Sequence, residues 1–404
     1  MGKSALKPRT AAELGIMRGF PPPPEKRPDL TNWDLAPFNR WSFMNIRNLF
    51  PTVDVKTDYS KRQALPTAMQ DLSAVEFENH AGRRVTLSDF LYSTYTDGFL
   101  VLHRGNVVTE QYFNSMQPDT PHLSQSVAKS VVGTLAGILQ DQGLIDQDSP
   151  LIRYVPELAR CGYRDAQLKH ALNMTSGIRF VEDYNMPGSD MTRIDIASGW
   201  RPVPRDETQP TIRDIILTLP KVRDHGKLFE YKSVETDVVA WVLERAAGKS
   251  LAELLSNLIW KKIGAEHNAF FTVDRAATAL ADGGFNATLR DYARFGQMMQ
   301  NNGQVGERQV VPPGWVDACA SGDRSVYRRT NTDIRSDGAY SNFWWDNNIV
   351  AGDFMARGVF GQMIYINREA ELTIVKLSTW PDYVITDFKR DSLAAFAAIQ
   401  QALA

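Results

Sequence analysis

The sequence predicts an α+β protein in which an antiparallel sheet is flanked by helices, with a second region that is mainly helical. Two observations predict the sheet. Residues 98–113, GFLVLHRGNVVTEQYF, have the pattern of two strands around a turn at 104–106. The end of the chain has the pattern strand, turn, strand, helix over 361–404. A terminal helix packed on an antiparallel sheet is the natural arrangement for that order.

The composition is that of a globular protein with a large core. The chain has 404 residues, of which 43% are hydrophobic and 23% charged, enough for one large domain or two. The net charge of −2 gives no general attraction to nucleic acid or to an anionic membrane, so we expect neither as a partner. Cys161 and Cys319 lack metal-ligand spacing and are expected to be free thiols.

The N-terminal residues 1–30 are expected to form an arm. The four consecutive prolines 21–24 cannot enter a helix or a central strand. Aromatic residues in 31–46 indicate that the next segment docks on the body of the protein.

The first 20 residues lack the apolar core of a secretory signal, and no stretch approaches the length of a membrane span. We therefore expect a cytoplasmic protein.

Helical periodicity marks three further segments. Residues 126–142 carry apolar side chains at helical spacing and end before Gly143, residues 234–260 read as two helices broken at Gly248, and 289–303 read as another. We assign residues 31–145, 196–288 and 323–404 to the sheet domain, and 146–195 and 289–322 to the helical region.

A candidate nucleophile stands at the start of the first of these helices. Ser126 lies in HLSQSVAKS, where unpaired backbone N–H groups and the helix dipole favour an anion. Lys129 lies on the same helix face. We expect burial to lower its pKa from about 10.4 toward neutrality, so that the amine could take the serine proton. The structural alternative is a helix-capping serine beside a solvated lysine.

A second candidate is Tyr231 in FEYKSVETD, whose hydroxyl could shuttle a proton. The structural alternative is a half-buried strand tyrosine.

Other known functional motifs are not matched by the sequence. AAGKS at 246–250 lacks the first glycine of a phosphate-binding loop, and G-x-S-x-G is absent. The six histidines form no H-x-x-x-H or H-x-H pair, so we expect neither a metal site nor a cofactor.

The order S-x-x-K, then Y-x-S about a hundred residues later, resembles the penicillin-recognising serine hydrolases. These include class C β-lactamases, D-alanyl-D-alanine peptidases and family VIII carboxylesterases. HALNMTSGI at 170–178 and GGFNATLRDYARFGQMM at 283–299 resemble segments of the same superfamily. The resemblance implies a β-lactamase-like fold.

Further short segments resemble the nylon-oligomer hydrolases, the 6-aminohexanoate-dimer hydrolase branch of that superfamily. They extend from about residue 30 to 385 and include PFNRWSF, VEDYNMPGSD, FEYKSVETDVVAWVLERAAG and GVFGQMIYINRE. By this resemblance Ser126 is the acylated nucleophile, Lys129 its base and Tyr231 the proton relay.

The third box of the superfamily, K-T-G or H-x-G, maps onto residues 356–358. Its cationic first residue is replaced by Ala356, which argues against β-lactam hydrolysis. Gly358 still lets the strand backbone approach closely, and the N–H groups of Val359 and Ser126 would form the oxyanion hole. Phe360 follows where members of the branch can carry histidine.

The resemblance also implies substrate-binding residues. Tyr184 corresponds to a tyrosine that bonds the scissile amide nitrogen, and Asp195 to an acid that holds the free amino end of the substrate. Trp200 and Trp345 match pocket walls. The structural alternatives are a solvated loop acid for Asp195 and core aromatics for the two tryptophans.

We therefore expect a serine hydrolase that cleaves short linear amides resembling the 6-aminohexanoate dimer through an acyl-enzyme on Ser126. Two alternatives stay open. One is a carboxylesterase acting on short-chain esters, and the other is a catalytically inactive protein on a penicillin-binding scaffold. The expected partner is a small amide or ester, and formation of a homodimer also stays open.

Overall fold

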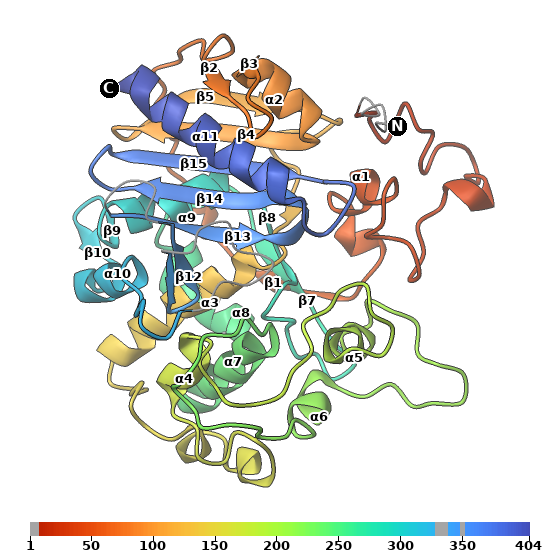
Figure 1. The fold of residues 1–404 in the computed structure, drawn as a ribbon, viewed down its shortest axis with the longest axis vertical. Helices are drawn as coiled ribbons and strands as arrows, with labels where there is room; N and C mark the ends of the chain where they lie inside the picture. Colours follow the sequence, from red (N-terminus) through yellow and green to blue (C-terminus); the bar gives the residue numbers. More distant parts are fainter. Residues whose placement is uncertain (1–7, 328–337, 348–351) are drawn as a thin grey trace.

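A seven-stranded antiparallel sheet is the centre of the computed structural model, which describes residues 8–327, 338–347 and 352–404 (Figure 1). The α+β prediction is confirmed. In spatial order the strands are β11 (Ala339–Ser341), β12 (Trp344–Asp346), β13 (Asp353–Gly358), β14 (Gln362–Asn367), β15 (Leu372–Ser378), β4 (Thr96–His103) and β5 (Asn106–Tyr112).

Both predicted pairs of strands are present in this sheet. Strands β4 and β5 form the hairpin, with positive φ at Arg104 and Gly105 in its turn. Strands β14 and β15 form the pair near the end of the chain, and β15 also pairs with β4. All residues of β13, β14 and β15 are buried, which follows from helices covering both faces of the sheet.

The terminal helix α11 (Thr386–Leu403) crosses one face of the sheet, as predicted (Figure 1). Its Phe396 packs on Tyr365 of β14. Helix α2 (Leu87–Ser93) and the strands β2 (Glu76–Glu78) and β3 (Arg84–Thr86) lie beside it.

The opposite face carries α3 (Val127–Asp141) and α9 (Leu289–Gln300). A Cβ added to Gly296 of α9 would come within 2.7 Å of Thr373 on β15, so this helix lies directly on the sheet. The expected domain bounds had placed 289–322 in the helical region. That expectation is wrong for α9, because helical periodicity does not say which surface the apolar face will meet.

A smaller antiparallel sheet has the order β1 (Thr52–Val55), β7 (Ala269–Thr272), β8 (Phe285–Ala287) and β6 (His122–Leu123). Strand β6 ends three residues before Ser126. The remaining short elements are α1 (Asn39–Ser42), α10 (Pro313–Cys319), β9 (Gln304–Val305), β10 (Arg308–Gln309), and single turns at Ile46–Asn48, Tyr59–Lys61, Leu151–Arg153, Pro156–Arg160, Ser256–Trp260 and Val359–Gly361.

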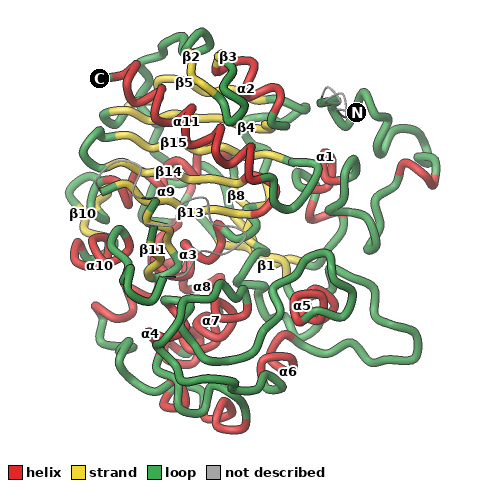
Figure 2. The backbone as a smooth tube through the Cα atoms, viewed as in Figure 1, coloured by secondary structure: helices red, strands yellow, loops and turns green. Residues whose placement is uncertain are grey.

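The lower half of the molecule consists of helices and long loops, as Figure 2 shows. Its helices are α4 (Leu168–Leu172), α5 (Asp190–Ala197), α6 (Ile212–Ile216), α7 (Val234–Ala247) and α8 (Leu251–Leu255). The predicted break between α7 and α8 is present, since Gly248 ends α7 in the left-handed conformation at φ 63°. Helix α7 packs against α3 and α4, which brings the segment before it close to Ser126.

The N-terminal segment docks on the body, as its aromatic residues predict. Trp33 is fully buried, and Pro24 begins a short turn at Pro24–Lys26, where a first turn tolerates proline. The side chain of Asn39 donates a hydrogen bond of 2.7 Å to the carbonyl of Trp380 near the other end of the chain. Residues 1–7 of the predicted arm lie outside the described residues.

Candidate active site

Ser126 occupies the N-cap of α3, and Lys129 lies one turn along the same helix. The Lys129 Nζ donates a hydrogen bond of 2.9 Å to the Ser126 Oγ and another of 2.6 Å to the backbone carbonyl of Asp282. Lys129 is buried, which excludes the solvated lysine of the structural alternative. The arrangement places an amine directly on a serine hydroxyl.

The expected fall in the pKa of Lys129 is not found. Burial lowers the pKa of its ammonium, but Tyr231 and the carboxyls of Asp282, Glu182 and Asp237 raise it, and the net direction is upward from the ordinary value. These acids lie in segments far from Lys129 in the sequence, which is why local pattern reasoning missed them. These neighbours favour the ammonium form of Lys129.

Tyr231 completes the group around Ser126. The Lys129 Nζ lies 5.4 Å from the centre of its ring. Burial raises the pKa of the Tyr231 hydroxyl, and Lys129 together with hydrogen bonding to Ser126 only partly opposes this. Serine, lysine and tyrosine thus lie together in one cluster.

The end of β13 lies directly against the segment that precedes Ser126. A Cβ added to Gly358 would come within 2.6 Å of the Ser124 carbonyl and 3.1 Å of the Gln125 Cβ. Only glycine permits this approach, which brings the backbone of Val359 beside Ser126. The side chain of Phe360 turns away into the core, where it packs on Phe43 and Tyr383.

One small pocket gathers most of the predicted site residues. It lies between the sheet and the helical region. Its lining residues are Ser126, Tyr184, Tyr231, Trp345, Arg357, Gly358, Val359, Met363 and Lys389.

Tyr184 enters this pocket with its proton already engaged. Its hydroxyl donates a hydrogen bond of 2.7 Å to Glu182, which in turn accepts hydrogen bonds from the backbone N–H and the hydroxyl of Ser233. Burial, with the charge of Glu182, raises the pKa of Tyr184 well above its usual value. The phenol stays neutral and presents an oxygen lone pair to the pocket.

Two predicted residues lie outside that lining. Asp195 is half-buried on α5, and burial raises the pKa of its carboxyl well above the ordinary value, with Arg201 opposing. Trp200 packs on Trp33, with ring centres 4.9 Å apart, and its ring faces Gly283. The core interpretation of Trp200 therefore fits the contacts, whereas Trp345 lines the pocket.

Sequence reasoning missed three charged residues of the site. Glu182 stands two residues before Tyr184, within the VEDY segment that was recognised. Arg357 stands immediately before Gly358, in the third box. Lys389 lies on α11 and has no local motif that could have marked it.

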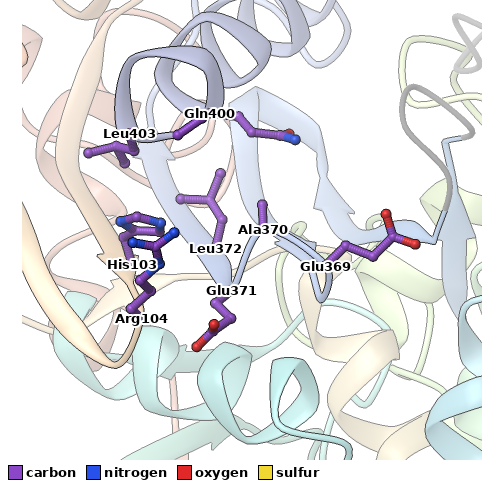
Figure 3. A pocket seen from close by; sticks show the side chains of 9 residues that line it. His103, Arg104, Glu369, Ala370, Glu371, Leu372, Gln400 and Leu403 are labelled. Atoms are coloured by element: carbon purple, nitrogen blue, oxygen red, sulfur yellow. The ribbon is translucent and has the colours of Figure 1, made fainter.

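A second pocket lies at the opposite end of the strands, where the β4–β5 and β14–β15 turns meet the end of α11 (Figure 3). His103, Arg104, Glu369 and Glu371 are among its lining residues. Ser126 is not among its lining residues.

Across the described residues, no group of three or more His, Cys, Asp or Glu side chains is arranged to hold a metal ion. Cys161 and Cys319 are free, and no described helix is long and apolar enough to cross a membrane.

Comparison with known proteins agrees with this geometry. The profile of the Beta-lactamase family matches residues 79–398. The 6-aminohexanoate-dimer hydrolase of Paenarthrobacter ureafaciens is 36% identical over 357 residues, covering 88% of this chain and 89% of that protein.

Solved structures show the same fold. A Bacillus anthracis structure provisionally named 6-aminohexanoate-dimer hydrolase superposes with a TM-score of 0.86 at 28% identity, covering 93% of this chain and 97% of the other. A family VIII carboxylesterase has a TM-score of 0.57 at 16% identity, covering 75% and 92% of the two chains, and shares the fold alone. The chain belongs to the beta-lactamase family and is one of its hydrolases.

Proposed function

We propose that the protein hydrolyses short linear amides resembling the 6-aminohexanoate dimer, through an acyl-enzyme on Ser126. The observation that carries the amide assignment is the Tyr184 hydroxyl, which lines the pocket of Ser126 while its proton is held by Glu182. The 36% identity to a protein named 6-aminohexanoate-dimer hydrolase supports the substrate class.

In this mechanism the Ser126 Oγ attacks the amide carbonyl and forms an ester with the acyl half of the substrate. Lys129, once deprotonated, takes the serine proton, and Tyr231 passes a proton to the leaving nitrogen. The backbone N–H groups of Ser126 and Val359 stabilise the oxyanion. Water then attacks the acyl-enzyme, and the same groups return the proton to Ser126.

Tyr184 acts on the leaving side. The Tyr184 hydroxyl donates its hydrogen bond to Glu182. Its oxygen can therefore accept a hydrogen bond from the N–H of the scissile amide. That bond orients the nitrogen so that its lone pair faces the proton donor. An ester has no N–H to donate, so this contact serves amides alone.

Asp195 is proposed to hold the amino end of the substrate. Its carboxyl is half-buried on α5, and an ammonium in contact would restore its negative charge and form a charge-assisted bond. Trp345 forms a wall of the pocket, stacked on Tyr231 with ring centres 5.5 Å apart.

The test compares an amide and an ester in three proteins. The parent enzyme should hydrolyse both the 6-aminohexanoate dimer and a nitrophenyl ester. Ser126→Ala should abolish both activities, and a fluorophosphonate probe should label Ser126 in the parent.

Tyr184→Phe should lower kcat/KM on the amide by about 10- to 150-fold, the worth of one strong hydrogen bond, and leave the ester nearly unchanged. Ester turnover without any amide turnover in the parent would make the protein a carboxylesterase. Labelling of a different serine would overturn the mechanism.

A further inference from the structure

We infer that the pocket of Ser126 contains a carboxylate-binding subsite, formed by Arg357 and Lys389, which takes the acid end of the leaving half of the substrate. The inference rests on the proposed function, because it extends that substrate to its second charged end. It makes the preferred substrate a zwitterion, with an amine on the acyl half and a carboxylate on the leaving half.

The two cations come from different elements and meet in one place. Arg357 is the residue before the end of β13, Lys389 lies in the first turn of α11, and both line the pocket that Ser126 lines. Their exposed fractions are only 8% and 7%. A carboxylate in the pocket would form charge-assisted hydrogen bonds with both.

The guanidinium of Arg357 is held in a defined plane. Its central carbon lies 3.6 Å from the centre of the Trp345 ring, and that ring stacks on Tyr231 at an interplanar angle of 21°. A fixed planar guanidinium matches the two oxygens of a carboxylate, which a flexible side chain does less well. The aromatic surface between Tyr231 and Arg357 offers an apolar path for a pentamethylene chain.

Acidic and basic side chains near the site come from different parts of the fold. Glu182 and Asp195 belong to the segment that leads into and forms α5, in the helical region, whereas Arg357 and Lys389 belong to the sheet and to the helix that covers it. In Figure 1, α5 lies below β13 and α11. A neutral ester or a simple alkyl amide uses neither charge. A linear amide of two ω-amino acids uses both.

The experiment uses two esters that differ only in the charge of the leaving group, 4-acetoxybenzoate and 4-acetoxybenzamide. The parent enzyme should prefer the benzoate in kcat/KM. Arg357→Met and Lys389→Met should each lower kcat/KM on the benzoate by roughly 10- to 100-fold, while the benzamide changes by less than about twofold. Arg357→Lys, which keeps the charge, should retain more benzoate activity than Arg357→Met.

The matched control is Lys249→Met, at an exposed lysine beside the end of α7, which should leave both esters unchanged. Losses of equal size on the two esters would mean that the cations only support the fold, and would overturn the subsite. A parent enzyme that neither prefers the benzoate nor binds 4-hydroxybenzoate more tightly than 4-hydroxybenzamide by calorimetry would overturn it too. Because the esters need no amide cleavage, absence of amide turnover would refute the proposed function while leaving the subsite standing.

Discussion

In the proposed mechanism, the charge of a single lysine decides at which pH the site can work. Lys129 must lose a proton before it can accept one from Ser126, and the neighbouring tyrosine and acids raise its pKa above the ordinary value. A raised pKa means that the reactive amine is a minor species at neutral pH and becomes more abundant as the pH rises. With Lys129 as the proposed base, we therefore expect activity to increase with pH.

We expect kcat/KM on a nitrophenyl ester to rise with pH through the neutral range, with no plateau below about pH 10, the ordinary lysine range. Ser126→Ala measures the background hydrolysis to be subtracted. Asp282→Asn removes one of the carboxyls that hold the ammonium, so the rise should begin at lower pH. A rate that is already constant from about pH 6 upward would show that Lys129 is neutral at rest.

At the scale of single residues, the sequence predicts those site residues that belong to short motifs. Ser126, Lys129, Tyr231 and Gly358 each belong to a compact pattern, and the structure places them together. The upward pKa of Lys129 could not be predicted, because Asp282 approaches it from a segment more than a hundred residues away in the sequence. Lys389 is still more distant, and nothing in α11 marks it.

At the scale of elements, the loop between β15 and α11 supports one side of the pocket through Tyr383. Its ring stacks on Tyr184 with centres 5.2 Å apart and an interplanar angle of 12°. Its hydroxyl donates a hydrogen bond of 2.8 Å to Asp34 and accepts one from Arg201. Its carbonyl accepts the N–H of Phe360, next to the proposed oxyanion residue. We hypothesise that Tyr383 is a positioning residue for Tyr184.

Tyr383→Leu removes the stacked ring, and we expect kcat/KM on the amide to fall by about 2- to 10-fold, the worth of an aromatic pair, with a smaller effect on the ester. Tyr383→Phe keeps the ring and should restore most of the amide activity. The ratio of amide to ester rates is the readout, since a general loss of folded enzyme would lower both equally. An unchanged ratio in Tyr383→Leu would refute the positioning role.

The sequence predicts the existence of helices and strands better than it predicts which elements they pack against. The β4–β5 hairpin, the β14–β15–α11 succession and the break at Gly248 all follow from local pattern and turn chemistry. The position of α9 on the sheet does not, because an apolar helix face fits either a sheet or another helix. The expected domain bounds remain a prediction in their other parts.

On the scale of the whole molecule, a buried network around Asp97 of β4 joins distant segments. Asp97 accepts hydrogen bonds from Arg40 at 2.9 Å, Asn114 at 2.9 Å and Thr379 at 2.8 Å, and His122 lies 3.2 Å away. Burial raises the pKa of Asp97, but Arg40, His122 and Thr379 outweigh it, and the net direction is downward. The network therefore stabilises the fold above the unfolded carboxyl pKa, and this contribution is lost as the pH falls through the lowered folded value.

Asp97→Asn leaves the Arg40 charge buried without its carboxylate. We expect a loss of about 3–5 kcal/mol in the free energy of unfolding, which at about 2 cal/mol/K per residue lowers the melting temperature by about 4–6 °C. Calorimetry at neutral pH and one fixed scan rate measures this.

The matched control is Asp317→Asn, which breaks the exposed Arg368–Asp317 pair and should cost less than about 1 kcal/mol. Equal decreases in melting temperature in the two variants would show that the Asp97 network contributes no more to stability than an exposed ion pair. The difference in melting temperature between Asp97→Asn and the parent should become smaller in strong acid, because the Asp97 carboxyl of the parent becomes protonated there.

The contacts between the two ends of the chain have a consequence for biosynthesis. Asn39 bonds to Trp380 across 341 positions, and Asp34 to Tyr383 across 349. A ribosome therefore exposes the early partners long before it has made the late ones. Closing such distant pairs is the slow part of folding. The wall that carries Tyr383 and Lys389 can form only after these residues have been synthesised, so a shorter nascent chain holds Ser126 and Lys129 but no complete pocket. The pocket around Ser126 is thus completed only after residue 389 has left the ribosome.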